Sequence, residues 1–549
     1  MDTRIATSIS ISIPVSLLAA LASCGGGQKS APPVAAVPPA ASTAPVAAGE
    51  PVFPEEAFRQ AQPTVGSPRD FQLPEMKRFQ LGERDKIDVY LVERHDLPTI
   101  SMDLNVDGGS MVDPPGKVGL ASVCMDLLSE GTRKLDKIAF SEALADVASD
   151  VSSYAGDDRQ GVEMNTLTRS FDPTLALFVD TVTEPGLRQE DLDRIIKRRL
   201  EALKQVRGSA QSVSGRLRGM VIYGLKHPLG RVTTEKTLGA IRLADCKRYQ
   251  QRYLRPRGAR LFIVGDTTEA QVRQSMAPLL ARWHGAPARV ARPPALHPPR
   301  GRIFFVNIPG AAQSSVAMVH PGPERLAPDY FPTMLLAQVL GGGFASRINM
   351  NLREDKGYSY GAGAGFGYSR FFGTFSARSA VRTDATYQTV LEMRREVGAL
   401  KDGSEPPTPD ELARDKEGTI LAQPAAFATA GSALDQYRAL IYFGLPLDYY
   451  NGYIDAVRAV TAEQVQQAGA AHLQPEAARY LVVGDGDAAQ IAHTPGEKGQ
   501  KGQDRPLVDA SGKPITLRAA LARLVADKTL GDGGLVELDP DGAVVKPAR

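Results

Sequence analysis

The chain has 549 residues, of which 43% are hydrophobic and 23% are charged. This is the composition of folded globular domains, and it excludes a wholly disordered or fibrous protein. The 64 basic and 62 acidic residues nearly cancel, so the sequence predicts no nucleic acid partner. Seven histidines and three cysteines are too few for a protein with several zinc or iron–sulfur sites.

The N-terminal segment predicts an export signal. Residues 9–22 are mostly apolar and follow Arg4. The run is shorter than the roughly 20 residues of a membrane-spanning helix and is typical of a signal peptide. It ends in Leu21-Ala22-Ser23-Cys24, which resembles a bacterial lipobox. We therefore expect a signal peptide over 1–24 and lipidation of Cys24, with an ordinary signal peptide and an incidental cysteine as the alternative.

Residues 25–68 are rich in proline and small residues, which predicts a flexible or polyproline-like tether. The lipidated Cys24 would then hold a folded body close to a membrane. We expect the protein in the bacterial cell envelope. Since Gly25 rather than aspartate follows the cysteine, the sequence is compatible with the outer membrane, with the body facing the periplasm.

An internal repeat organises the rest of the chain. Residues 254–266 and 473–485 share the pattern Leu-x-Pro, then Ala-Arg and an apolar run ending in Gly-Asp, at a constant separation of 219 residues. Each copy predicts a helix end, a turn and a buried strand, followed by a second helix from Thr268 or from Ala488. The chain therefore contains two related halves.

The predicted organisation is α+β, with two homologous α+β halves. The parts are an N-terminal half over 69–285, a proline-rich linker over 286–301, a C-terminal half over 302–490, and a polar appendage over 491–549. The pattern predicts strands over 79–81, 87–92, 99–106 and 315–319, and helices over 119–128, 190–206, 330–340 and 516–526.

Two further cysteines, Cys124 and Cys246, lie in apolar, helix-like stretches. We expect two buried free thiols, because nothing in the sequence brings them together. A disulfide in an oxidising periplasm is the alternative.

Three stretches together resemble the pitrilysin/insulinase metallopeptidases, or inverzincins. They are 108–132 (Gly-Gly-Ser, Gly-Leu-Ala and Leu-Leu-Ser-Glu-Gly-Thr), 227–266 (His-Pro-Leu-Gly through Val-Gly-Asp), and 340–360 (Leu-Gly-Gly-Gly-Phe through Gly-Tyr-Ser-Tyr). The resemblance covers about residues 70–490. It implies the fold of the mitochondrial processing peptidases, in which two homologous halves form half of a clamshell around a peptide.

Zinc-binding members of the family carry His-x-x-Glu-His in the helix after Gly-Leu-Ala and a further glutamate later in the chain. Two imidazoles four residues apart chelate zinc, and the intervening glutamate is the general base. The matching positions are Ser122, Met125 and Asp126, with the distal ligand near Ala202. None of these residues supports a zinc site, and Glu201 alone cannot form one. We therefore expect no metal or other cofactor in this chain.

Family enzymes also carry an arginine and a tyrosine seven residues apart, which face the zinc from the other half. Arg353 and Tyr360 have this spacing, whereas Tyr358 does not. The resemblance implies that Arg353 donates hydrogen bonds to a substrate carbonyl and that the Tyr360 hydroxyl stabilises the oxyanion.

The chain therefore resembles the zinc-less Arg/Tyr subunit of bacterial two-chain members. That resemblance implies a homologous partner subunit that supplies zinc, and an unfolded peptide as substrate. The main alternative is a catalytically inactive member that acts as a peptide-binding or structural assembly protein. Hydrolysis by Ser122 and Asp126 alone is disfavoured, because that serine has no histidine base.

Overall fold

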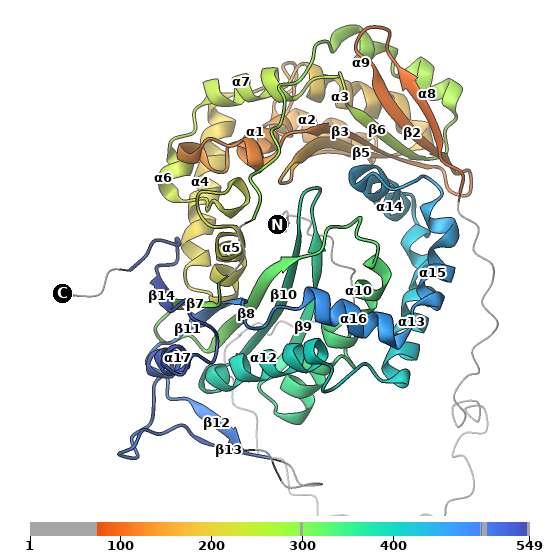
Figure 1. The fold of residues 1–549 in the computed structure, drawn as a ribbon. Coiled ribbons are helices and arrows are strands. Elements are labelled where there is room, and N and C mark those ends of the chain that lie inside the picture. Colours follow the sequence, from red (N-terminus) through yellow and green to blue (C-terminus); the bar gives the residue numbers. More distant parts are fainter. Residues whose placement is uncertain (1–73, 297–299, 495, 497–501, 546–549) are drawn as a thin grey trace, which may run out of the picture. The chain divides into compact units, whose positions relative to one another are not determined.

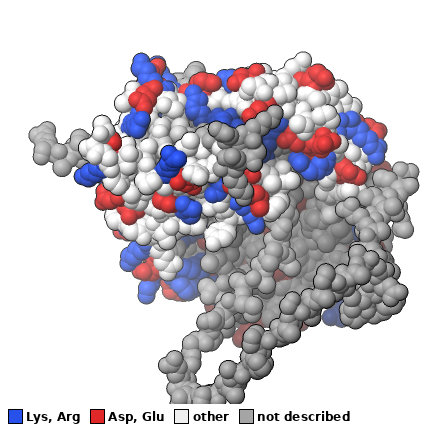
Figure 2. Space-filling view, turned by 90° about the horizontal axis from the view of Figure 1, so that it is seen from below, with Lys and Arg blue, Asp and Glu red and all other residues white. Residues whose placement is uncertain are grey.

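The computed structural model describes residues 74–296, 300–494, 496 and 502–545. The predicted signal peptide, the lipidation site Cys24 and the tether lie outside these residues. Within the described part of the chain, no helix combines the length and the apolar character needed to cross a membrane. Acidic and basic side chains are interspersed over the face shown in Figure 2, in keeping with the balanced charge.

The first half is built on a six-stranded mixed sheet with the strand order β1-β2-β6-β3-β5-β4. Its strands are β1 (Lys77–Leu81), β2 (Ile87–Glu93), β3 (Thr99–Asp107), β4 (Asp150–Ala155), β5 (Arg159–Leu167) and β6 (Arg260–Gly265). Strands β2 and β6 run parallel, and every other neighbouring pair is antiparallel. Alternation places Ile100, Met102 and Leu104 of β3 in the main core, while Asp103 points to the other face.

Eight helices of the first half pack with this sheet around one core (Figure 1). They are α1 (Leu120–Leu128), α2 (Lys137–Asp146), α3 (Phe171–Thr183), α4 (Gln189–Val206), α6 (Glu235–Gly239), α7 (Leu243–Tyr253), α8 (Glu269–Ser275) and α9 (Ala277–Arg282). Each contributes buried apolar side chains to one cluster, so the helices and the sheet form a two-layer unit.

The second half repeats this plan with the strand order β14-β7-β11-β8-β10-β9. Its strands are β7 (Arg302–Asn307), β8 (Gln313–Gly322), β9 (Ser359–Tyr368), β10 (Gly373–Arg382), β11 (Arg479–Gly484) and β14 (Leu535–Leu538). The helices of this half are α10 (Tyr330–Ala337), α11 (Arg347–Asn349), α12 (Thr386–Asp402), α13 (Pro409–Ala422), α15 (Tyr453–Ala459), α16 (Ala462–His472) and α17 (Leu517–Ala526). The α+β fold of two similar halves is thereby confirmed.

Each half also sends one helix to the other half. Helix α5 (Ala210–Tyr223) belongs to the first half in sequence but packs on β8 and β11 of the second sheet. Helix α14 (Ala430–Phe443) belongs to the second half in sequence and packs on β3 and β6 of the first sheet (Figure 1). Each of these helices therefore packs on the sheet of the other half.

The end of the chain differs from the prediction. The helix expected from Ala488 is absent, because a turn after Asp485 leads instead into the hairpin of β12 (Ile491–Thr494) and β13 (Gln503–Pro506). The helix that packs at this place is α17, whose first N–H, from Leu517, donates to the Ala488 carbonyl. Strand β14 then pairs with β7, so these residues belong to the packed body of the second half.

Candidate functional site

The helix at the degenerate zinc motif is capped by a buried carboxylate. Gly119 precedes α1 with a left-handed φ of 98°, which glycine adopts without strain. The Asp113 carboxylate accepts from the N–H groups of Gly119 at 2.7 Å and Ala121 at 2.8 Å. Burial raises the pKa of Asp113 to about 6 despite these bonds. The cap fixes the start of α1 and so the direction of its side chains.

An arginine bonds two of the side chains that match the zinc-ligand positions of the motif. Arg199 of α4 donates to the Ser122 hydroxyl at 3.0 Å and to the Asp126 carboxylate at 2.7 Å. Met125 is 1% exposed and belongs to the hydrophobic core, and Ala202 lies on the exposed side of α4. Since a fixed cation already neutralises the one carboxylate, these residues do not fit a zinc ion. Among the described residues, no three histidine, cysteine or acidic side chains form a metal-binding group.

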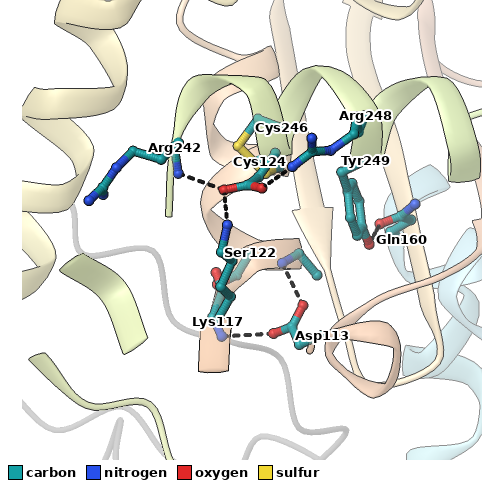
Figure 3. Close-up of a disulfide and its surroundings, with 12 residues drawn as sticks. Asp113, Lys117, Ser122, Cys124, Gln160, Arg242, Cys246, Arg248 and Tyr249 are labelled. Atoms are coloured by element: carbon teal, nitrogen blue, oxygen red, sulfur yellow. Dashed lines mark hydrogen bonds and ion pairs between the residues drawn. A yellow bond between two sulfur atoms is a disulfide. The ribbon is translucent and has the colours of Figure 1, made fainter. Parts of the chain in front are cut away.

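The prediction of two free thiols is wrong. Cys124 of α1 and Cys246 of α7 form a disulfide, with an Sγ–Sγ distance of 2.08 Å (Figure 3). The two helices pack side by side although 122 residues separate the cysteines, so local sequence carried no sign of the contact. Next to the bond, Lys117 and Asp245 form an ion pair of 2.5 Å. The disulfide ties α1 to α7.

The second candidate region begins at the π-helical turn η7 (Met350–Asp355), which carries Arg353. The Arg353 side chain is 41% exposed, and its Nε lies 3.1 Å from the carboxylate of its neighbour Glu354. The guanidinium also lies over the Phe344 ring, 4.7 Å from its centroid. Gly357, with a φ of 63°, then turns the chain into β9. Such π-turns are frequent at functional sites.

The two nearby tyrosines have opposite environments. Tyr360 is 88% exposed, and its hydroxyl makes no hydrogen bond to any residue that the structure describes. Tyr358 is 1% exposed, and its hydroxyl donates to Asp504 at 2.7 Å. A register shift between Ser379 and Val381 of β10 accompanies this change. Tyr358 is therefore a packing residue, and Tyr360 is free to contact another molecule.

Buried polar residues support η7 from below, and the sequence analysis missed them. The Asn351 amide donates to Glu392 at 2.9 Å and to Glu396 at 2.6 Å. Both glutamates lie on α12 and are less than 10% exposed. The one available signal was their position, four residues apart, on the helix face that also carries Val390, Met393 and Val397.

Arg353 and Tyr360 can together bind a carbonyl group and polarise it. Arg353 offers a planar set of N–H donors and Tyr360 an O–H donor, and both are accessible. Donors of this kind bind a peptide carbonyl and stabilise the negative charge that develops on it. The residues at the former zinc motif supply neither a metal ligand set nor a free general base.

Comparison with known proteins gives two family matches. The insulinase (peptidase family M16) profile matches residues 89–222, and the peptidase M16 inactive domain profile matches residues 240–419. The non-peptidase homolog YmxG of Helicobacter pylori is 20% identical over 402 residues, which are 72% of this chain and 92% of that protein. An uncharacterized zinc protease of Rickettsia bellii is 20% identical over 55% of this chain and 73% of its own length.

Solved structures show the same fold. A peptidase M16 inactive domain from Pseudomonas fluorescens superposes with a TM-score of 0.68 at 24% identity, over 74% of this chain and 98% of that one. A protease from Helicobacter pylori superposes with a TM-score of 0.65 at 16% identity, over 75% of this chain and all of that one. The two profile matches succeed each other along the chain and together cover more than half of it. The chain therefore belongs to the peptidase M16 (insulinase) family.

Proposed function

We propose that this chain is the non-zinc-binding subunit of an M16-type peptidase. It supplies Arg353 and Tyr360 in trans to a homologous partner, and the partner supplies zinc and the glutamate base. The substrate is an unfolded peptide. The observation that carries the proposal is the contrast between the exposed Tyr360, at 88%, and the zinc-motif position, where Arg199 is bonded to Asp126.

The chemistry assigned to this chain is substrate and oxyanion binding. Arg353 donates to a substrate carbonyl from a planar guanidinium. The Tyr360 hydroxyl donates to the oxygen that becomes negative when water attacks. Removing one such donor typically costs about 100- to 1000-fold in kcat.

A second candidate is a binding or assembly protein without a catalytic partner. It is favoured by the similarity to a relative whose name is non-peptidase homolog YmxG. Because one fold can serve several functions, family membership does not separate the two candidates. They differ in what happens when Arg353 and Tyr360 are changed.

The test is a peptidase assay with zinc quantification on the mature chain, alone and mixed with a His-x-x-Glu-His homologue from the same organism. We expect no hydrolysis by either chain alone and hydrolysis by the mixture. Tyr360→Phe and Arg353→Ala should abolish that activity while the two chains still associate. Tyr253→Phe and Arg458→Ala, which change a tyrosine and an exposed arginine elsewhere, should leave it unchanged.

Two outcomes would overturn the proposal. Stoichiometric zinc and activity in the lone chain would show that the residues at 122–126 are competent. A mixture that associates but stays inactive, or that stays active in the Arg353 and Tyr360 variants, would favour the binding or assembly protein.

We further propose that Cys24 anchors the protein to a membrane of the cell envelope. The Cys124–Cys246 disulfide supports this, since such bonds persist mainly outside the reducing cytoplasm. The test is labelling with a radioactive fatty acid, which Cys24→Ala should abolish while it moves the protein into the soluble fraction. Label that remains in the variant would contradict the proposal.

A further inference from the structure

The β12–β13 hairpin is an element that the first half lacks. In the first half, β6 ends at Gly265, and Thr268 caps the next helix directly. In the second half the chain turns away from the sheet after Asp485. It comes back to the equivalent place only at Thr516, which caps α17. The Ala489–Thr516 bridge closes this excursion at its base. The sheet and the helix are therefore built as in the first half, and the hairpin is an addition.

The hairpin contacts the Arg/Tyr segment through a carboxylate. Asp504 of β13 accepts from the Tyr358 hydroxyl at 2.7 Å, and the His493 ring Nδ1 lies 2.9 Å from the same oxygen. Tyr358 is 1% exposed, whereas the Asp504 side chain is 30% exposed. A buried hydroxyl needs a partner, and this one finds it in the hairpin.

A second line of hydrogen bonds runs from the hairpin to η7. The His493 N–H donates to the Gln388 side chain at 3.0 Å, and the Gln388 amide donates to Glu392 at 2.9 Å. The other oxygen of Glu392 accepts from Asn351 at 2.9 Å and lies 3.6 Å from Lys356 Nζ. The network therefore joins the hairpin to the turn that carries Arg353.

The two ends of this network bracket the exposed pair. Asn351 lies two residues before Arg353, and Tyr358 lies two residues before Tyr360. The Tyr360 side chain has no hydrogen bond to the described residues, so its position depends on the backbone beside it. That backbone is fixed at Tyr358, whose N–H donates to Leu352 and whose carbonyl accepts from Arg382.

We propose that the hairpin positions the segment 350–360 and that Asp504 is its positioning residue, acting through the Tyr358 hydroxyl. Asp504 touches no substrate in this scheme. It holds the buried tyrosine, and the buried tyrosine holds the strand start from which Tyr360 projects. The catalytic meaning of this contact rests on the function proposed above, but the contact itself can be tested without a partner.

The first experiment is hydrogen exchange of the full chain, read by mass spectrometry on peptides that cover 350–360. We expect Tyr358→Phe and Asp504→Ala each to speed exchange there about tenfold, the effect of losing one hydrogen bond to a charged acceptor. The double variant should exchange no faster than the faster single variant, because both changes remove the same contact. Asp504→Asn keeps an acceptor oxygen, so this variant, unlike Asp504→Ala, should exchange as slowly as the wild type.

The matched control is Asp487→Ala, which removes an exposed carboxylate from the same excursion. It should leave exchange over 350–360 unchanged, and all variants should leave the first half unchanged. Unaltered exchange in Tyr358→Phe and Asp504→Ala, or effects that multiply in the double variant, would overturn the proposal.

The second experiment uses the mixture with the zinc-bearing homologue. Tyr358→Phe should lower kcat about tenfold with little change in KM, since the segment is misplaced while the peptide contacts remain. Asp504→Asn, which keeps an acceptor for the Tyr358 hydroxyl, should have the kcat of the wild type. If the mixture shows no hydrolysis at all, the proposed function fails and the exchange result still decides the positioning role. Hydrolysis with an unchanged kcat in Tyr358→Phe overturns the positioning role alone.

Discussion

The two sheets share five equivalent strands and differ at the edge strands β1 and β14, which pair antiparallel and parallel with their neighbours. The two halves also differ in the environment of their motif residues. In the first half the motif helix is closed: Met125 is buried, Arg199 bonds Asp126, and a disulfide fixes Cys124. In the second half the motif is open, with Tyr360 exposed and the support placed beneath it. At the first motif Met125 is buried while Arg199 and Asp126 are partly exposed, whereas the exposed Tyr360 follows a turn that rests on buried polar residues.

The two contacts between the halves also differ, because one is mainly apolar and the other contains a buried ion pair. Helix α5 meets the second sheet through an apolar cluster in which Val213 and Leu217 are fully buried. Helix α14 meets the first sheet through charge, because Arg438 lies 3.0 Å from Asp103 and 2.6 Å from Glu163. The two exchanged helices are equivalent in topology. Arg479 of β11 also donates to carbonyls of α5, but only the α14 contact contains a fully buried carboxylate, that of Asp103.

The largest expected effect is a change in zinc affinity at the first motif, where Arg199 bonds Asp126. Restoring the ligand types with Ser122→His, Met125→Glu, Asp126→His and Ala202→Glu should leave zinc at no more than about a tenth per chain, because Arg199 would remain as a competing cation. Adding Arg199→Ala should tighten zinc binding at least about 100-fold. Metal analysis and competition with a chromophoric chelator measure this. Stoichiometric zinc in the variant that retains Arg199 would show that the arginine does not close the site.

The disulfide gives the next largest effect. It closes a loop spanning 122 residues, so Cys124→Ser with Cys246→Ser should lower the free energy of unfolding by about 4 kcal/mol. Urea unfolding of the wild-type chain with and without dithiothreitol measures this. The reductant should have no effect on the double variant. If dithiothreitol does not lower the free energy of unfolding of the wild-type chain, the disulfide does not stabilise the first half as proposed.

The charged contact of α14 predicts a dependence on pH. Burial raises the pKa of the Asp103 carboxyl to about 6, although Arg438 lowers it and Glu163 raises it further. Between about pH 4 and pH 6 the folded chain therefore holds a proton that the unfolded chain has released. The free energy of unfolding should fall as pH rises through this window, by at most about 3 kcal/mol, and this contribution should be constant above it.

Asp103→Asn should remove this dependence and leave the chain more stable at pH 7, as measured by urea unfolding at a series of pH values. Asp88→Asn is the control, since that carboxylate lies 3.8 Å from Arg78 at the surface and should change stability by less than about 1 kcal/mol. A free energy of unfolding that rises with pH through the same window in the wild type, but not in Asp103→Asn, would show that folding lowers the pKa of Asp103 instead of raising it.

The sequence could predict features that depend on local pattern. The repeat locates β6 and β11 because both are short apolar strands closed by Gly-Asp, and periodicity places α4. It could not predict the partner of Cys124, since 122 residues lie between the two cysteines. Strand β14 was missed because four residues among glycines carry little signal until β7 pairs with them. The supports of η7 were missed because Glu392 is read as a surface residue unless its partner Asn351 is known.

The smallest expected effect concerns a cation on α5, the helix that meets the second sheet through an apolar cluster. Arg218 of α5 is partly buried beside Arg378, and burial lowers its pKa before the second positive charge lowers it further. No acidic side chain among the described residues contributes to its pKa shift. Arg218→Met should therefore raise the free energy of unfolding by about 1 kcal/mol. Arg207→Met, which removes ion pairs with Glu235 and Asp541, is the matched control and should lower it by up to about 1 kcal/mol. A loss of stability in Arg218→Met would mean that this guanidinium stabilises the α5 contact, which would then depend on charge as the α14 contact does.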